Sequence, residues 1–324
     1  MRKLFVFSAM LMLSVAAIYF SACNNNKTEP EATTTDTNKD SVDQAVKRGE
    51  YLTLHVGMCL DCHSQRDFSK YSGPIIAGTE GKGGEEFDQK LGVPGVVYAR
   101  NITPDKETGI GAWSDDDLLK AMTQGISKNG DTLFAIMPYY NLNRMAKEDL
   151  LNIIAYLRTL KPINNKVPAR HLMAPTMAFY NPKFLQPTID GNTRPPQSDA
   201  LKYGEYLVTL ADCETCHTPM TPKGPDMTRP FAGSFLFDAG TFKVNSANLT
   251  SDSATGLGTW TEERFMNKFI QYRDEKNINM DAGKQNTFMP VSAYAGMTDV
   301  DLKAVYAYIH SLRPIKNQVE KYPK

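Results

Sequence analysis

Two five-residue stretches, Cys59-Leu60-Asp61-Cys62-His63 and Cys213-Glu214-Thr215-Cys216-His217, decide what this 324-residue chain can be. Both have the form Cys-x-x-Cys-His, the attachment sequence of c-type haem. On one helical turn the first and fourth residues share a face, so both thiols can reach the two vinyl groups of one porphyrin. The histidine that follows then serves as the proximal iron ligand. The sequence therefore predicts two covalently bound haem c groups, attached through Cys59, Cys62, Cys213 and Cys216, with His63 and His217 on the irons.

Three other roles for paired cysteines fit these stretches less well. A structural zinc site needs a second ligand pair close by, and His55, His171 and His310 are not paired at zinc spacing. Two disulfides would leave the histidine after each pair unexplained. A thioredoxin-type redox site is expected to follow a strand, whereas a helical pattern precedes both motifs.

The two motifs are part of a longer internal repeat. The second motif lies 154 residues after the first, and other short sequences recur in the same order. Extra residues near 81–89 in the first copy and 277–284 in the second change the spacing. The sequence thus predicts duplication of one haem-binding unit. The matched stretches are 48–52 with 203–207, Ala77-Gly78-Thr79 with Ala232-Gly233-Ser234, Asn101-Ile102-Thr103 with Asn248-Leu249-Thr250, 108–113 with 255–260, Met137-Pro138 with Met289-Pro290, and 158–162 with 310–314.

Each unit needs a second axial ligand, and Met137 and Met289 are the candidates. They stand 74 and 72 residues after the motif histidines, and no other methionine is matched in this way. A thioether is a soft, neutral ligand that favours ferrous iron. The proline after each methionine fixes φ and donates no N–H, which suits a rigid loop. Because most methionines fill cores, the prediction depends on the repeated position.

Secondary-structure signals are helical in both copies. Ser114 and Thr261 predict helix N-caps, since acidic residues follow each of them. The last helix of each copy carries an apolar stripe and stops before Pro162 or Pro314. Strand signals are nearly absent, so we expect an all-α fold of two tandem units. The stripes are Leu150, Ile153, Ile154, Leu157 and Leu160 in the first copy, and Leu302, Val305, Tyr306, Ile309 and Leu312, after the cap Thr298, in the second.

The N-terminus carries an export signal. Two basic residues precede an apolar run over residues 4–20, and Ser21-Ala22-Cys23 follows it. Residues 1–22 are therefore predicted to be a signal, and the small residues before Cys23 resemble the lipobox of bacterial lipoproteins, where the cysteine carries the lipid. An uncleaved anchor helix is the alternative, since this run is near the lower limit for spanning. Both place the body in the periplasm or cell envelope, tied to a membrane.

Composition sets the remaining boundaries. Residues 23–41 lack an apolar cluster and predict a flexible tether. Two domains, 42–163 and 198–324, are expected on either side of a Pro-rich connecting segment, 164–197. Lys plus Arg equals Asp plus Glu, 36 each, so the charge balance gives no sign of a nucleic-acid partner.

Several stretches resemble one known family. Asn101-Ile102-Thr103-Pro104-Asp105, residues 109–114, Met137-Pro138-Tyr139 and Ala155-Tyr156-Leu157-Arg158 are similar to the cytochrome c subunit of bacterial membrane-bound alcohol and gluconate dehydrogenases. With its copy, the resemblance covers nearly all of residues 46–314. It implies tandem class I cytochrome c domains with His/Met ligation that accept electrons from a dehydrogenase in the periplasm. Those subunits usually carry three haem domains, whereas this chain has two motifs.

Two classes of function remain. The first is an electron carrier with both axial positions filled, which is not itself an enzyme. Its partners would be redox proteins such as a dehydrogenase, a respiratory complex or a terminal oxidase. The second is a di-haem peroxidase, which needs one iron with an open sixth position. Two matched Met-Pro loops favour the carrier.

A repeated glycine predicts how each unit is packed. Gly49 and Gly204 stand in the helix before each motif, where Gly costs up to about 1 kcal/mol relative to Ala. Close approach of another helix accounts for this cost. Class I cytochromes resemble this arrangement, since their first and last helices cross at a glycine that faces an aromatic residue. We therefore expect Gly49 to pack near Tyr156 and Gly204 near Tyr308.

Overall fold

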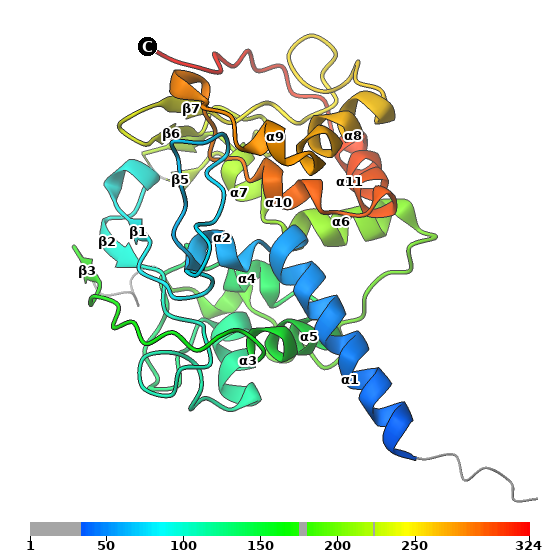
Figure 1. The fold of residues 1–324 in the computed structure, drawn as a ribbon. Coiled ribbons are helices and arrows are strands. Elements are labelled where there is room, and N and C mark those ends of the chain that lie inside the picture. Colours follow the sequence, from blue (N-terminus) through cyan, green and yellow to red (C-terminus); the bar gives the residue numbers. More distant parts are fainter. Residues whose placement is uncertain (1–33, 175–179, 223) are drawn as a thin grey trace, which may run out of the picture.

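The computed structural model describes residues 34–174, 180–222 and 224–324, which form helices joined by long loops and short strands (Figure 1). Cys23 and the predicted signal lie outside these ranges. Within them, no helix is both long and apolar enough to cross a membrane. The helices are α1 Thr34–Tyr51, η1 Leu52–Val56, α2 Cys59–His63, η2 Gln89–Leu91, α3 Asp115–Gln124, α4 Tyr139–Leu142, α5 Lys147–Leu157, η4 Pro182–Phe184, α6 Ala200–Leu210, α7 Cys213–His217, α8 Glu262–Ile270, η5 Gln271–Arg273, α9 Glu275–Ile278, η6 Gly283–Gln285, α10 Val291–Ala295 and α11 Asp299–Ser311.

Two crossed helix pairs frame the molecule: α1 packs on α5, and α6 packs on α11. The expected caps are present, because the side chains of Ser114, Thr261 and Thr298 each accept a backbone N–H in the first turn of α3, α8 and α11. The apolar stripes face the core, and Leu150 and Leu302 are fully buried. These predictions are confirmed.

Both crossings occur at the predicted glycines. A Cβ atom at Gly49 would overlap a backbone carbonyl oxygen of α5 and lie 3.0 Å from Cβ of Tyr156. A Cβ atom at Gly204 would overlap a carbonyl oxygen of α11 and lie 3.0 Å from Cβ of Tyr308. The expected contacts with Tyr156 and Tyr308 are confirmed, and they show why only glycine fits at these two positions.

The fold is mainly helical, but "all-α" is too narrow a description of the residues that the structure describes. Seven strands form one three-stranded and two two-stranded antiparallel sheets. Strands this short have no alternating apolar pattern, so sequence periodicity could not predict them. The strands are β1 Glu86–Phe87, β2 Gly95–Tyr98, β3 His171–Leu172, β4 Met220–Thr221, β5 Gly224–Pro225, β6 Leu236–Asp238 and β7 Lys243–Asn245.

The segments expected to be loose are partly structured. Helix α1 already begins at Thr34, whereas the sequence predicted a flexible tether up to residue 41. Adding residues to an existing helix is far easier than starting one, so α1 extends beyond its packed part. The connecting segment lies along the first half, because Gly95 and Val96 of β2 pair with Leu172 and His171 of β3.

The two halves meet through reciprocal polar contacts. The Tyr51 hydroxyl donates to Asp301 Oδ2 at 2.6 Å, and the Tyr206 hydroxyl donates to Asp149 Oδ2 at 2.7 Å. Both carboxylates are buried. Burial and the nearby carboxylate raise the pKa of both tyrosines, so the hydroxyls stay protonated as donors. Each half thus supplies one tyrosine and one aspartate to the same interface.

We predict that Gly49→Ala and Gly204→Ala each lower the free energy of unfolding by about 1–3 kcal/mol, because the added methyl group forces the crossed helices apart. Gly191→Ala is the control, since a Cβ there meets nothing within 4 Å. Chemical denaturation measures the three values. Equal stability of Gly49→Ala and Gly191→Ala would contradict the crossing.

Candidate haem sites

The two Cys-x-x-Cys-His motifs form the single-turn helices α2 and α7, as their spacing predicts. A residue with left-handed backbone precedes each: Met58 with φ 49° and Asp212 with φ 51°. This conformation is uncommon for residues with a side chain. It ends the preceding helical segment and lets the motif begin a new helix in another direction. Both halves make this bend at the same place.

The four motif thiols are free. Cys62 and Cys216 are exposed, and Cys59 and Cys213 are partly buried. Surrounding protein nevertheless raises the pKa of Cys59, Cys62 and Cys213 to about 12, and it also raises that of Cys216. All four are therefore protonated at neutral pH, and each motif presents a pair of S–H groups.

Both motif histidines are neutral and held in one orientation. His63 Nδ1 lies 2.6 Å from the Arg100 carbonyl oxygen, and His217 Nδ1 lies 2.7 Å from that of Ala247. Burial lowers the pKa of both imidazoles. A carbonyl can only accept, so the proton is on Nδ1 and the lone pair of Nε2 is free. Metal-bound histidines usually have this second contact, which fixes the ring for its ligand role.

The repeated Asn-x-Thr sequences hold these carbonyl groups in place. Asn101 and Asn248 directly follow the two accepting residues and are buried. Each Oδ1 accepts the backbone N–H two residues on, at 2.9 and 3.0 Å. Each Nδ2 donates to a carbonyl beyond the last helix of its half, Ile163 at 2.7 Å and Ile315 at 2.8 Å. The sequence showed the repeat, but it did not show that this turn orients the histidine.

A glycine packs behind each of these turns: Gly83 in the first half and Gly233 in the second. The sequence comparison had matched a different glycine with Gly233. The N–H groups of Gly83 and Gly233 donate to the carbonyls of His63 and His217 at 2.8 and 2.6 Å. Both glycines have left-handed φ. A Cβ would lie 2.5 Å from the backbone carbonyl carbon of Arg100 in the first half and of Ala247 in the second. The match of Gly78 with Gly233 is wrong, because a Cβ at Gly78 meets nothing within 4 Å. Four extra residues before Gly83 displaced the match.

The candidate methionines occupy equivalent turns. Tyr139 N–H donates to the Met137 carbonyl at 2.7 Å, and Val291 N–H donates to the Met289 carbonyl at 2.8 Å. The prolines between them have φ −78° and −79° and ψ 48° and 63°, close to an inverse γ-turn. Both methionine side chains are partly buried against the core. Each Met-Pro therefore forms a fixed turn that opens a short helix, α4 or α10.

The two motifs are neighbours across the interface between the halves. Desolvation by the surrounding protein is the main cause of the raised pKa of Cys62, and the charges of Asp61, in its own motif, and of Asp212, in the other half, add to it. Burial likewise dominates at Cys216, where Asp212, Cys213 and Cys62 add to it. Asn141, which follows the Met137 turn, donates to Asp212 Oδ1 at 2.7 Å. Groups near both motifs are thus close enough to act on one another.

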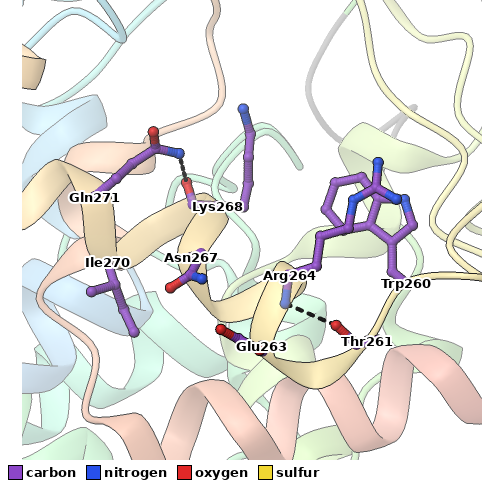
Figure 2. Close-up of a pocket in the computed structure, with 8 residues that line it drawn as sticks. All are labelled: Trp260, Thr261, Glu263, Arg264, Asn267, Lys268, Ile270 and Gln271. Carbon is purple, nitrogen blue, oxygen red and sulfur yellow. Dashed lines mark hydrogen bonds between the residues drawn. The ribbon is translucent and has the colours of Figure 1, made fainter.

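A surface hollow elsewhere contains none of the candidate residues. It lies along α8, where the Arg264 guanidinium carbon sits 4.2 Å from the centre of the Trp260 ring (Figure 2). Among the described residues, no group of three or more His, Cys, Asp or Glu side chains is arranged to hold a metal ion. The hollow is lined by Trp260, Thr261, Glu263, Arg264, Asn267, Lys268, Ile270 and Gln271.

Comparison with known proteins finds similarity to c-type cytochromes and to cytochrome c subunits of dehydrogenases. The gluconate 2-dehydrogenase cytochrome c subunit of Pantoea cypripedii is 30% identical over 293 residues, which are 83% of this chain and 60% of that protein. The cytochrome c subunit of the quinone alcohol dehydrogenase of Gluconobacter oxydans is 29% identical over 290 residues, 85% of this chain and 56% of that protein. A diheme c-type cytochrome of Cereibacter sphaeroides is 27% identical over 198 residues, 57% of this chain and 62% of that protein. No family model matches. The chain therefore spans about 60% of the length of these relatives.

We predict that Asn101→Ala and Asn248→Ala each lower the free energy of unfolding by about 1–3 kcal/mol, because buried partners of the amide lose their hydrogen bonds. Asn164→Ala is the matched control, since its amide bonds an exposed carboxylate at 3.1 Å. Denaturant titration measures all three variants. If Asn164→Ala lowered the free energy of unfolding as much as Asn101→Ala, the buried turn would contribute no more stability than an exposed hydrogen bond.

Proposed function

Since this chain is homologous to cytochrome c subunits of bacterial dehydrogenases, we propose that it is a di-haem c-type cytochrome that transfers single electrons between partner proteins. One observation carries the proposal. In each half, two free thiols accompany a neutral imidazole whose Nδ1 is bonded to the backbone and whose Nε2 is free. This donor set fits haem c.

When bound, haem c supplies an iron couple that takes up and releases one electron. In this proposal Cys59 and Cys62, and likewise Cys213 and Cys216, would hold the haem covalently by adding their S–H bonds across its vinyl groups. Sulfur bonds one carbon and the hydrogen goes to the next, so no oxidant is needed. His63 and His217 would hold the irons through Nε2, while their Nδ1–H groups, bonded to backbone carbonyls, keep the rings from rotating.

We further propose that Met137 and Met289 are the sixth ligands, within their own halves. His63 would share an iron with Met137, and His217 with Met289. Equivalent turns at both methionines support this assignment. Each half also contains its own first helix, motif, methionine turn and last helix, so each can enclose its own cofactor.

We also propose that the chain consists of two tandem domains that arose by duplication, 42–163 and 198–324, joined by 164–197. The Asn turns, the glycine crossings and the methionine turns recur in both halves, which supports the duplication. The class I cytochrome c fold accounts for the crossed first and last helices. We regard the small sheets as additions to this helical framework.

The proposed setting is the periplasm or cell envelope of a bacterium. Residues 1–22 would be the export signal, and Cys23 would carry a lipid that ties the chain to a membrane. The electron donor would be a dehydrogenase, as in the names of the relatives. A respiratory complex or terminal oxidase would take the electron. No catalytic role is assigned to the chain itself.

We expect mass spectrometry of the exported protein to show two covalent haems. Cys59→Ala should weaken attachment in the first half only, and Cys213→Ala in the second only, because each thiol pair serves one porphyrin. Ser69→Ala, which removes a solvent-exposed side-chain bond, is the control. A single haem in the parent protein would contradict the proposal.

Met137→His and Met289→His should each keep a low-spin haem and lower one of two reduction potentials, because imidazole stabilises ferric iron more than thioether does. A spectroelectrochemical titration measures both potentials. Unchanged potentials in both variants would show that these methionines are core residues. A high-spin ferric haem in the parent protein would instead favour the peroxidase.

A further inference from the structure

We propose that Ser72 and Asn286 are positioning residues for Met289, so that a loop of the first half holds the axial methionine of the second. This inference rests on the proposed function, in which Met289 binds the second iron. It assigns to the first half a structural part in the other half's iron site.

The Ser72 hydroxyl, from the first half, hydrogen-bonds both ends of the Met289 turn. Its Oγ donates to the Met289 carbonyl at 2.7 Å and accepts the Val291 N–H at 3.0 Å. The same N–H and carbonyl bond each other at 2.8 Å across Pro290. Ser72 is 1% exposed, so water does not compete for these bonds. One hydroxyl therefore ties together both ends of the turn that presents the sulfur.

Asn286 fixes Ser72 in turn. Its Oδ1 accepts the Ser72 N–H at 2.9 Å and the Thr287 N–H at 2.8 Å. Its Nδ2 donates to the carbonyls of Phe68 and Lys70 at 2.8 and 3.0 Å. The side chain is fully buried, and all four of its hydrogen-bonding positions are used. A buried network this complete holds one geometry.

The contact joins segments that depart from the repeat. The loop between His63 and Gly83 has four more residues than its counterpart between His217 and Gly233. In Figure 1 this blue loop after α2 reaches toward α9 and α10. There Tyr71 N–H donates to the Met280 carbonyl at 3.1 Å. The Met137 turn has other surroundings, since α4 borders the connecting segment.

The loop is also anchored to the first motif. Arg66 Nε donates to the Gly73 carbonyl at 2.7 Å, and its Nη2 donates to the Ser72 carbonyl. The same Nη2 lies 3.6 Å from Asp61 Oδ2, within the motif helix α2. A chain of polar contacts therefore leads from the first attachment site to the second methionine.

Ser72→Gly is the most specific test of the role of the hydroxyl. Ser72 has φ 66°, which glycine adopts without strain, so this change removes the hydroxyl while keeping the backbone. Asn286→Ala removes the other half of the network. Ser69→Ala is the control, because it deletes a hydroxyl of the same loop that bonds only Asp67.

The measurement is a pH titration of the near-infrared Met–Fe(III) band in the full chain with both haems. We expect half of the band in Ser72→Gly to disappear at a pH about one unit lower than in the parent, because losing two hydrogen bonds makes displacement of the methionine about tenfold easier. The other half of the band should disappear at the same pH as in the parent. Ser69→Ala should match the parent, and Asn286→Ala should resemble Ser72→Gly. If Asn286→Ala does not fold, Ser72→Gly alone decides.

An unchanged titration of Ser72→Gly overturns the inference, and so does an equal shift of both halves of the band, which signals general destabilisation. Met289→His separates this failure from that of the proposed ligand. If it leaves the band whole, Met289 is not a ligand and the assignment of the second site is wrong. If it removes half of the band while Ser72→Gly has no effect, only the positioning role is wrong.

Discussion

The rest of the structure depends on two close helix crossings, which are possible because Gly49 and Gly204 have no side chain. Each lets two helix backbones touch at a crossing that any Cβ would block. In the first half, the helix that crosses at this point leads through η1 into α2, and in the second half α6 leads into α7. The crossing therefore fixes the helix that leads to each attachment motif against the last helix of its half. A small error there would displace both thiols and the imidazole together.

A second set of contacts, between each motif histidine and a nearby turn, determines the tautomer of the imidazole. A buried Asn fixes a turn, the turn fixes a carbonyl, and the carbonyl takes up Nδ1–H. None of these steps involves a charged group, although His217 is buried and His63 is partly buried. The protein thus selects one tautomer by hydrogen bonding and leaves the other nitrogen basic. The same result in both halves indicates that this arrangement is a property of the unit.

Local rules explain what the sequence could predict. Caps such as Ser114, stripes such as the one containing Leu150, and the glycine at 49 depend on neighbours within one or two helices, and their patterns are visible in the chain. The role of Gly83 was missed, because the four extra residues before it displaced the match and only tertiary contact identifies its partner. Ser72 gave no signal at all, since Asn286 and Met289, the partners that define its role, lie more than 200 residues away. The short strands and the early start of α1 were missed for a related reason: neither has a periodic apolar pattern.

The reciprocal contacts of Tyr51 with Asp301 and Tyr206 with Asp149 have an evolutionary consequence. Two identical single-haem chains could associate through this same surface, each giving one tyrosine and receiving one. On the proposed duplication, joining them into one chain would have freed the two copies of the contact to diverge. The surroundings already differ: Arg48 and Arg194 both bind Asp149, whereas Gln197 contacts Asp301 at 3.3 Å. An ancestral symmetric pair would change both sites with every mutation, but the fused chain can alter one and preserve the other.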